Sequence, residues 1–98
     1  MDMEALMAQA QELQNKVTAA QEKLADTRIK GLSADGSCIM EITGKYDFVS
    51  ISIKQDILAG GAKKVESVVA EAFRDAKAKA DKIIDEVMGQ ATAGVPMP

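Results

Sequence analysis

The sequence predicts an α+β fold in which a long helix, a three-stranded antiparallel meander and a second long helix follow one another. Three patterns predict this order: an unbroken heptad spacing over 2–27, a period of two over 28–54, and a return to helical spacing over 62–88. The 98 residues suffice for one domain. We predict that this domain spans 1–88 and that 89–98 form a flexible tail, because the tail contains glycine and proline but no charged side chain.

The first helix carries apolar residues alternately three and four positions apart, which is the spacing of the a and d positions of heptads. They are Met3, Leu6, Ala10, Leu13, Val17, Ala20 and Leu24. Such a narrow seam is typical of a helix that packs on another helix, as in a coiled coil. The alternative is that this helix lies on its own sheet. Under the first interpretation, the dimer-interface residues are Leu6, Leu13, Val17 and Leu24.

The segment after Thr27 reads as three short strands. Asp35-Gly36 is a strong hairpin signal, and Gly44 opens a second turn that ends at Asp47. Between these turns Cys38, Met40 and Ile42 alternate with more polar positions, and the same alternation continues over 48–54. This pattern indicates a meander with one apolar and one polar face.

A connection over 55–61 leads through Gly60-Gly61 into the second helix. A helix of about 26 residues is roughly 39 Å long, whereas strands of roughly six residues span only ~20 Å. The helix ends should therefore project beyond the sheet. Their apolar stripes must meet each other or a second subunit. Because the chain has only three aromatic residues, its own core is thin, and a homodimer is the expected remedy.

The composition argues against catalysis. The chain has no histidine and a single cysteine, Cys38, which excludes Ser-His and Cys-His triads and makes a zinc site improbable. Cys38 is expected to be a buried small hydrophobic residue. The glycines do not match the phosphate-binding Walker pattern. We therefore expect no enzyme activity, cofactor, metal or small-molecule substrate. The chain also lacks a secretory signal and any apolar run of about 20 residues, so we expect a cytoplasmic protein without a membrane partner.

The basic residues are the remaining functional candidates. The formal net charge is -3, which is unlike that of a strongly basic nucleic-acid binder. Two copies, however, would sum their cations into one surface that touches several phosphates of double-stranded DNA. Such binding is weak, sequence-tolerant and sensitive to salt. The predicted DNA-contact residues are Lys16, Lys23, Arg74, Lys77, Lys79 and Lys82.

Nearly the whole chain is similar to one known family. The segments Leu6–Gln14, Gly31–Gly44 and Val68–Ala76, closed by Gly94–Pro98, resemble in order and spacing the YbaB/EbfC family of bacterial nucleoid-associated proteins. The resemblance implies an intertwined homodimer whose protruding helices bind duplex DNA without catalysis, in the nucleoid, for chromosome organisation or gene regulation. The chain departs from the family at its start, Met1-Asp2-Met3-Glu4, where many members carry a basic, glycine-rich segment.

A second class of function also suits the order of helix, hairpin and helix. A coiled-coil scaffold or a prefoldin-like chaperone subunit would present its hairpin between two long heptad arms and would not bind DNA. The third strand and the short arms argue against this alternative.

Overall fold

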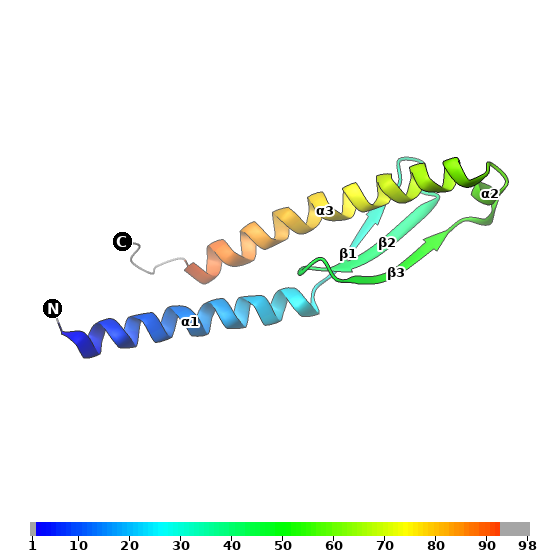
Figure 1. Ribbon diagram of the computed structural model, residues 1–98. Helices are drawn as coiled ribbons and strands as arrows, with labels where there is room; N and C mark the ends of the chain where they lie inside the picture. The colour runs from blue at the N-terminus through cyan, green and yellow to red at the C-terminus, as the bar shows by residue number, and fades with distance from the viewer. Residues whose placement is uncertain (1, 93–98) are drawn as a thin grey trace.

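The computed structural model describes residues 2–92 and has the predicted α+β order of elements (Figure 1). The elements are α1 (Met3–Asp26), β1 (Arg28–Leu32), β2 (Cys38–Thr43), β3 (Phe48–Ile53), α2 (Gln55–Leu58) and α3 (Ala62–Thr92). The short helix α2 lies in the segment that the sequence predicted only as a connection.

Local side chains explain where α1 begins and ends. The Asp2 carboxylate accepts a hydrogen bond from the backbone N–H of Glu4 at 3.0 Å, which satisfies one of the free donors of the first turn. At the other end Thr27 has an extended backbone, and its N–H donates to the Leu24 carbonyl at 3.1 Å. The chain therefore leaves α1 at Thr27 and enters β1 directly.

The three strands form one antiparallel sheet in the order β1-β2-β3. Gly31 on β1 lies opposite Met40 on β2, and Met40 lies opposite Ile51 on β3. The register then shifts, so that Phe48 lies opposite Ile42. The predicted turn between β1 and β2 is confirmed, and its Gly36 has a φ of 74°, which side chains other than glycine rarely adopt.

The core lies between α3 and the β1–β2 half of the sheet. Ala72, Ala76 and Ala80 are fully buried there, and a Cβ placed on Gly31 would lie 2.2 Å from the carbonyl oxygen of Ala72. Small side chains therefore allow the helix backbone to rest directly on β1. Cys38 is buried in this core, as the sequence predicted.

The C-terminal end of α1 also packs on its own chain. Leu24 is 4% exposed, and Gly44 at the end of β2 lies against it. The Gly44 N–H donates to the Leu24 carbonyl at 2.9 Å, and a Cβ on Gly44 would lie 2.7 Å from that oxygen. This contact fixes the direction in which α1 leaves the sheet.

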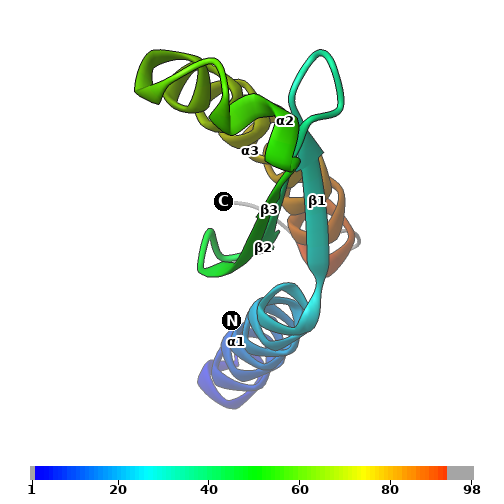
Figure 2. The same cartoon turned by 90° about the vertical axis from the view of Figure 1, so that its right-hand side faces the viewer.

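The molecule is a narrow rod, seen from the side in Figure 1 and end-on in Figure 2. Its extents are 68 × 19 × 15 Å, and its radius of gyration is 19.2 Å. A compact domain of this length has a radius of gyration of about 13 Å. The N-terminal part of α1 and the C-terminal part of α3 extend past the sheet, which confirms the projection predicted from helix length.

The second long helix continues beyond its predicted end at residue 88. It reaches Thr92, so the first four residues of the predicted 89–98 tail are helical. Gly89 does not stop the helix, because one glycine costs only about 1 kcal/mol relative to alanine in a long helix. The rest of the predicted tail, 93–98, lies outside the described residues.

Candidate nucleic-acid interface

Three of the six predicted DNA-contact residues form ion pairs within their own helix. Lys79 Nζ lies 2.8 Å from Asp75 Oδ2, Lys77 Nζ lies 3.2 Å from Asp81 Oδ2, and Lys16 Nζ lies 3.5 Å from Glu12 Oε1. Each pair spans four residues of an exposed helix surface, and pairs of this kind contribute at most about 1 kcal/mol. A phosphate can therefore compete with each carboxylate for its lysine.

The other three predicted contacts keep their charge free. Within the described part of the chain, Lys23, Arg74 and Lys82 have no carboxylate within 4.0 Å, and all three are exposed. A free cation on an exposed helix is the simplest donor to a DNA phosphate. Helical spacing would also allow ion pairs of Arg74 with Glu71 and of Lys82 with Asp85 or Glu86, but in residues 2–92 these pairs are not formed.

Two of the paired lysines lie on different flanks of α3. Lys79 Nζ also donates to the backbone carbonyl of Lys30 on β1 at 3.0 Å. On the other flank, the Asp81 carboxylate that binds Lys77 also accepts from the Tyr46 hydroxyl in the turn between β2 and β3. One protomer therefore does not gather its α3 lysines into a single patch.

The carboxylates in these pairs are held in their charged form. The Lys79 ammonium and the Leu32 N–H keep the pKa of Asp75 below its usual value. The Tyr46 hydroxyl and the Lys77 ammonium lower the pKa of Asp81 in the same way, and the hydrogen bond to Asp81 raises the pKa of Tyr46. Lys77 and Lys79 thus neutralise acidic groups that would otherwise repel a duplex.

An open depression of about 440 Å³ lies along the first half of α3. Its lining includes two bases, Lys63 and Arg74, and two acids, Glu66 and Glu71. The acids offset the bases, so the depression as a whole carries no positive charge. It is not an anion pocket, although Arg74 at its rim remains available.

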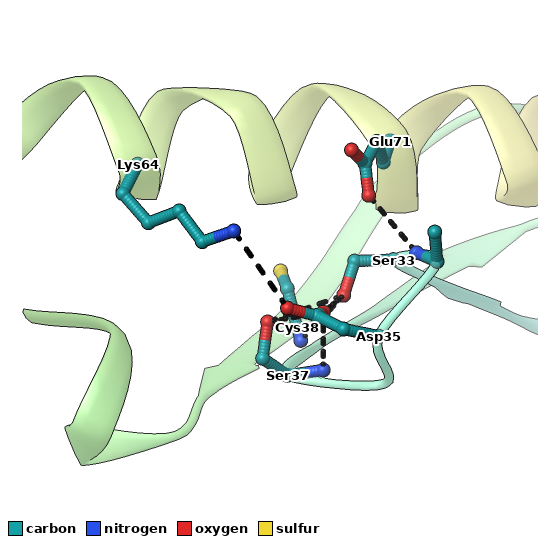
Figure 3. A network of polar contacts seen from close by, with 7 residues as sticks. Ser33, Asp35, Ser37, Cys38, Lys64 and Glu71 are labelled. Carbon is teal, nitrogen blue, oxygen red and sulfur yellow. Dashed lines mark hydrogen bonds and ion pairs between the residues drawn. The ribbon is translucent and has the colours of Figure 1, made fainter. Parts of the chain in front are cut away.

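A polar network that the sequence did not predict orders the turn between β1 and β2 (Figure 3). Asp35 accepts hydrogen bonds from the Ser37 hydroxyl at 2.6 Å, the Ser37 N–H at 3.0 Å and the Ser33 hydroxyl at 2.8 Å. Lys64 lies 4.0 Å from the same carboxylate. These donors hold the pKa of Asp35 well below its usual range. Because every partner is structural, the network fixes the turn and offers no catalytic group.

The described residues show neither a metal-binding cluster nor a membrane-spanning helix. Residues 2–92 contain no group of three or more acidic, cysteine or histidine side chains placed to hold a metal ion. No helix in this range is both long and apolar enough to cross a membrane.

Comparison with known proteins identifies the family. The family model described as the YbaB/EbfC DNA-binding family matches residues 1–95. The chain belongs to the YbaB/EbfC DNA-binding family. A nucleoid-associated protein of Rhodospirillum rubrum is 35% identical over 94 residues, which cover 95% of this chain and 88% of the relative. The family resemblance seen in the sequence is thereby confirmed.

A solved structure supports the fold assignment. The crystal structure of an uncharacterized protein from Helicobacter pylori superimposes with a TM-score of 0.80 at 17% identity. The match covers 92% of this chain and 96% of that protein. YbaB/EbfC membership places the chain in a DNA-binding family, and it disfavours the prefoldin-like alternative.

The predicted dimer seam on α1 divides into two parts in this YbaB/EbfC structure. Leu6 is 41% exposed near the free end of the helix, and Leu13 and Val17 are half-buried. Leu24, by contrast, is buried against Gly44 of its own chain. The heptad spacing is the same for contacts within a chain and for contacts with a partner, so it cannot separate them. Because Leu24 is buried in its own chain, it supports the fold and its side chain is not available to a partner.

Proposed function

We propose that this YbaB/EbfC protein binds duplex DNA as an intertwined homodimer, mainly through phosphates, and takes part in chromosome organisation or gene regulation in the bacterial nucleoid. The observation that supports this most directly is that three of the predicted DNA-contact residues on the two long helices are exposed and unpaired. They are Lys23, Arg74 and Lys82. Their spread along a rod 68 Å long suits contacts with several phosphates of one duplex.

The net charge of -3 explains why one copy is not sufficient. Acidic residues outnumber basic residues on α1, so a single chain offers few unopposed cations to a polyanion. Two copies double the number of phosphate contacts while both engage the same duplex, and the second contact then forms at high effective concentration. Binding of this kind recognises the DNA backbone, and we expect little sequence preference.

A titration of labelled mixed-sequence duplex at several salt concentrations tests the phosphate mechanism. The three unpaired predicted contacts of each protomer give six contacts per dimer, so the slope of log affinity against log salt should approach about -5. A flat salt response would rule the mechanism out. Affinity for a single strand above that for the duplex would overturn the choice of double-stranded DNA.

A double variant identifies the residues responsible. Arg74→Gln with Lys82→Gln should flatten the slope by about 3.6, because four phosphate contacts per dimer are lost. Lys54→Gln is the matched control, since Lys54 is exposed where β3 joins α2, at the end of the sheet away from the projecting helices. An equal loss per charge removed in this control would mean that the charge of the whole chain, rather than these two residues, determines affinity.

A further inference from the structure

We infer that the projecting ends of α1 and α3 form an acidic tip, which keeps duplex DNA off this end of the rod and confines it to the part that carries the sheet. The acidic tip is defined here as residues 2–15 and 83–92. The inference rests on the proposed binding of duplex DNA and adds where on the rod the duplex lies. It moves the contact implied by the family resemblance from the free ends of the protruding helices to their bases.

The acidic and basic side chains are unevenly distributed along the chain. All twelve lysine and arginine residues lie between Lys16 and Lys82, together with ten of the fifteen acidic residues, so this segment has a formal charge of +2. The acidic tip holds the other five acidic residues and no base, which gives it a formal charge of -5. The five are Asp2, Glu4, Glu12, Asp85 and Glu86.

The fold brings both parts of the acidic tip to the same end of the rod. The free ends of α1 and α3 extend past the sheet in the same direction (Figure 1). In the described part of the chain, residues 2–12 are exposed throughout, and the first buried residue of α1 is Ala20. Ala80 is the last buried residue in the same part of the chain. Two segments far apart in the sequence therefore add their negative charge in one place.

The charge of the acidic tip is largely uncompensated. All five tip carboxylates are exposed, and within residues 2–92 only Glu12 has a cation within 4.0 Å, namely Lys16 Nζ at 3.5 Å. The last turn of α3 has no basic residue, so the partial negative charge of this helix end adds to the carboxylates. At the start of α1 the helix dipole offsets the charge of Asp2 and Glu4 only in part.

A duplex laid along the acidic tip would be repelled. Residues 2–15 span about 21 Å at 1.5 Å per residue, and duplex DNA carries one charge per ~1.7 Å, so about twelve phosphates would lie beside this segment. The repulsion falls off over the Debye length, which is about 10 Å at 0.1 M salt and therefore shorter than the tip. The tip thus repels a duplex on its own surface and leaves contacts nearer the sheet intact.

The three unpaired contacts proposed above all lie on the sheet side of the acidic tip. Lys23 is in the last turn of α1, next to the start of β1. On α3, the exposed residue Ala78 is four residues from both Arg74 and Lys82, so it neighbours both on the helix surface. A duplex that contacts Arg74 and Lys82 therefore passes over Ala78.

A matching position exists in the acidic tip. Ala8 is exposed and is four residues from both Glu4 and Glu12, and it lies on the face of α1 opposite the heptad seam. Because Cys38 is buried, a cysteine placed at either alanine is the accessible thiol of the described residues. Ala8→Cys and Ala78→Cys are therefore matched reporters, one between two carboxylates and one between two cations.

Site-specific cross-linking with these reporters tests the position of the duplex. Each variant is coupled to a photoreactive group with a reach of about 10 Å, the diameter of a helix, and is irradiated with labelled mixed-sequence duplex. We expect about tenfold more cross-linked DNA from Ala78→Cys than from Ala8→Cys, because local charge changes the concentration of a polyanion at a surface by at least this factor.

Neutralising the acidic tip should admit the duplex. In the background Glu4→Gln with Glu12→Gln, cross-linking from Ala8→Cys should rise at least about threefold at low salt, and the rise should shrink as salt screens the remaining charge. The matched control, Asp47→Asn with Asp56→Asn, removes the same charge from exposed positions outside the tip. It should leave the Ala8→Cys signal unchanged.

Three results would overturn the acidic tip: equal cross-linking from Ala8→Cys and Ala78→Cys, no rise in the Glu4→Gln and Glu12→Gln background, or an equal rise in the control background. Binding without any cross-link from Ala78→Cys would show that the duplex lies elsewhere and would also overturn the inference. A titration without duplex binding would instead remove the proposed function itself, so the two failures are distinguishable.

Discussion

The backbone of Ala72 rests directly on Gly31: a Cβ at Gly31 would lie 2.2 Å from the Ala72 carbonyl oxygen and 2.5 Å from the Ala76 Cβ. No side chain separates α3 from β1 at this point. The close approach brings two α3 side chains within reach of the β1 backbone: Asp75 accepts from the Leu32 N–H at 2.9 Å, and Lys79 Nζ donates to the Lys30 carbonyl at 3.0 Å. Two of the smallest residues thereby set the close spacing of helix and sheet on which both the core and these polar contacts depend.

Gly31→Ala should destabilise the protein by roughly 1–3 kcal/mol, the usual range for an overpacked core, because the clashing atoms belong to the backbone and cannot rotate away. Urea denaturation measures the change. Gly89→Ala is the control, and it should change the free energy of unfolding in the opposite direction. Gly89 lies in α3 with open space around it, so alanine there should stabilise the protein by up to about 1 kcal/mol. A Gly31→Ala variant as stable as wild type would contradict the packing described here.

Neutralising a paired cation of α3 and neutralising an unpaired one should change DNA binding and thermal stability differently. Lys82→Gln should flatten the salt slope of DNA binding by about 1.8 per dimer and leave the melting temperature nearly unchanged. Lys79→Gln should flatten the slope less and lower the melting temperature, since Lys79 holds Asp75 and the Lys30 carbonyl. Equal slopes for the two variants would show that the ion pairs break fully on DNA.

Acid should weaken the turn held by Asp35. The pKa of the Asp35 carboxyl in the native protein lies below the ordinary 3.8. The largest cause is the hydrogen bond from the Ser37 hydroxyl, and the Ser37 N–H and the Ser33 hydroxyl lower the pKa further. The unfolded chain therefore takes up a proton at higher pH than the native chain. The stabilisation is fully present above about pH 4 and is lost as the pH falls toward the native pKa.

The variant Asp35→Asn isolates this contribution. It should be less stable than wild type near pH 7 and should lose less stability than wild type between about pH 5 and about pH 2, followed by urea midpoints. Asp56→Asn, on the exposed helix α2, is the comparison. Parallel pH profiles for wild type and Asp35→Asn would show that the turn network does not respond to acid.

Cys38 should react slowly with thiol reagents in the native protein. Its side chain is fully buried, and burial raises the pKa of the thiol, so the reactive thiolate is scarce and inaccessible. Labelling should accelerate in urea in step with unfolding. Native labelling at the rate of the unfolded chain would contradict the burial of Cys38 in the core.

Most of the fold follows from local pattern. The change of apolar period near Thr27 and the Asp35-Gly36 turn place the elements correctly, because both depend only on neighbouring residues. The polar contacts that α3 side chains make with the backbone of β1 and the turn after it do not follow in this way. Glu71 has Arg74 nearby on its own helix, yet it binds the Ala34 N–H, a partner that depends on how α3 lies along β1.

The candidate site was predictable in residue type and less so in detail. Lysine and arginine on long helices mark the candidates, but Lys77, Lys79 and Lys82 each have carboxylates within four residues, and only the structure shows that Lys82 remains unpaired. The heptad pattern gives no means of separating Leu24, which packs on Gly44, from the exposed Leu6. The exposure of Phe48 and Ile51 on β3 does not follow from the sequence pattern, because it depends on the path of α3 across the sheet.

The contact between α3 and β1 has a kinetic consequence. Glycine and alanine have no side-chain rotamers to lose, so docking Ala72, Ala76 and Ala80 onto Gly31 reduces only backbone freedom. The helix can therefore pack on the hairpin without a search among the rotamers of large side chains. We therefore expect the helix and the hairpin to dock early during folding.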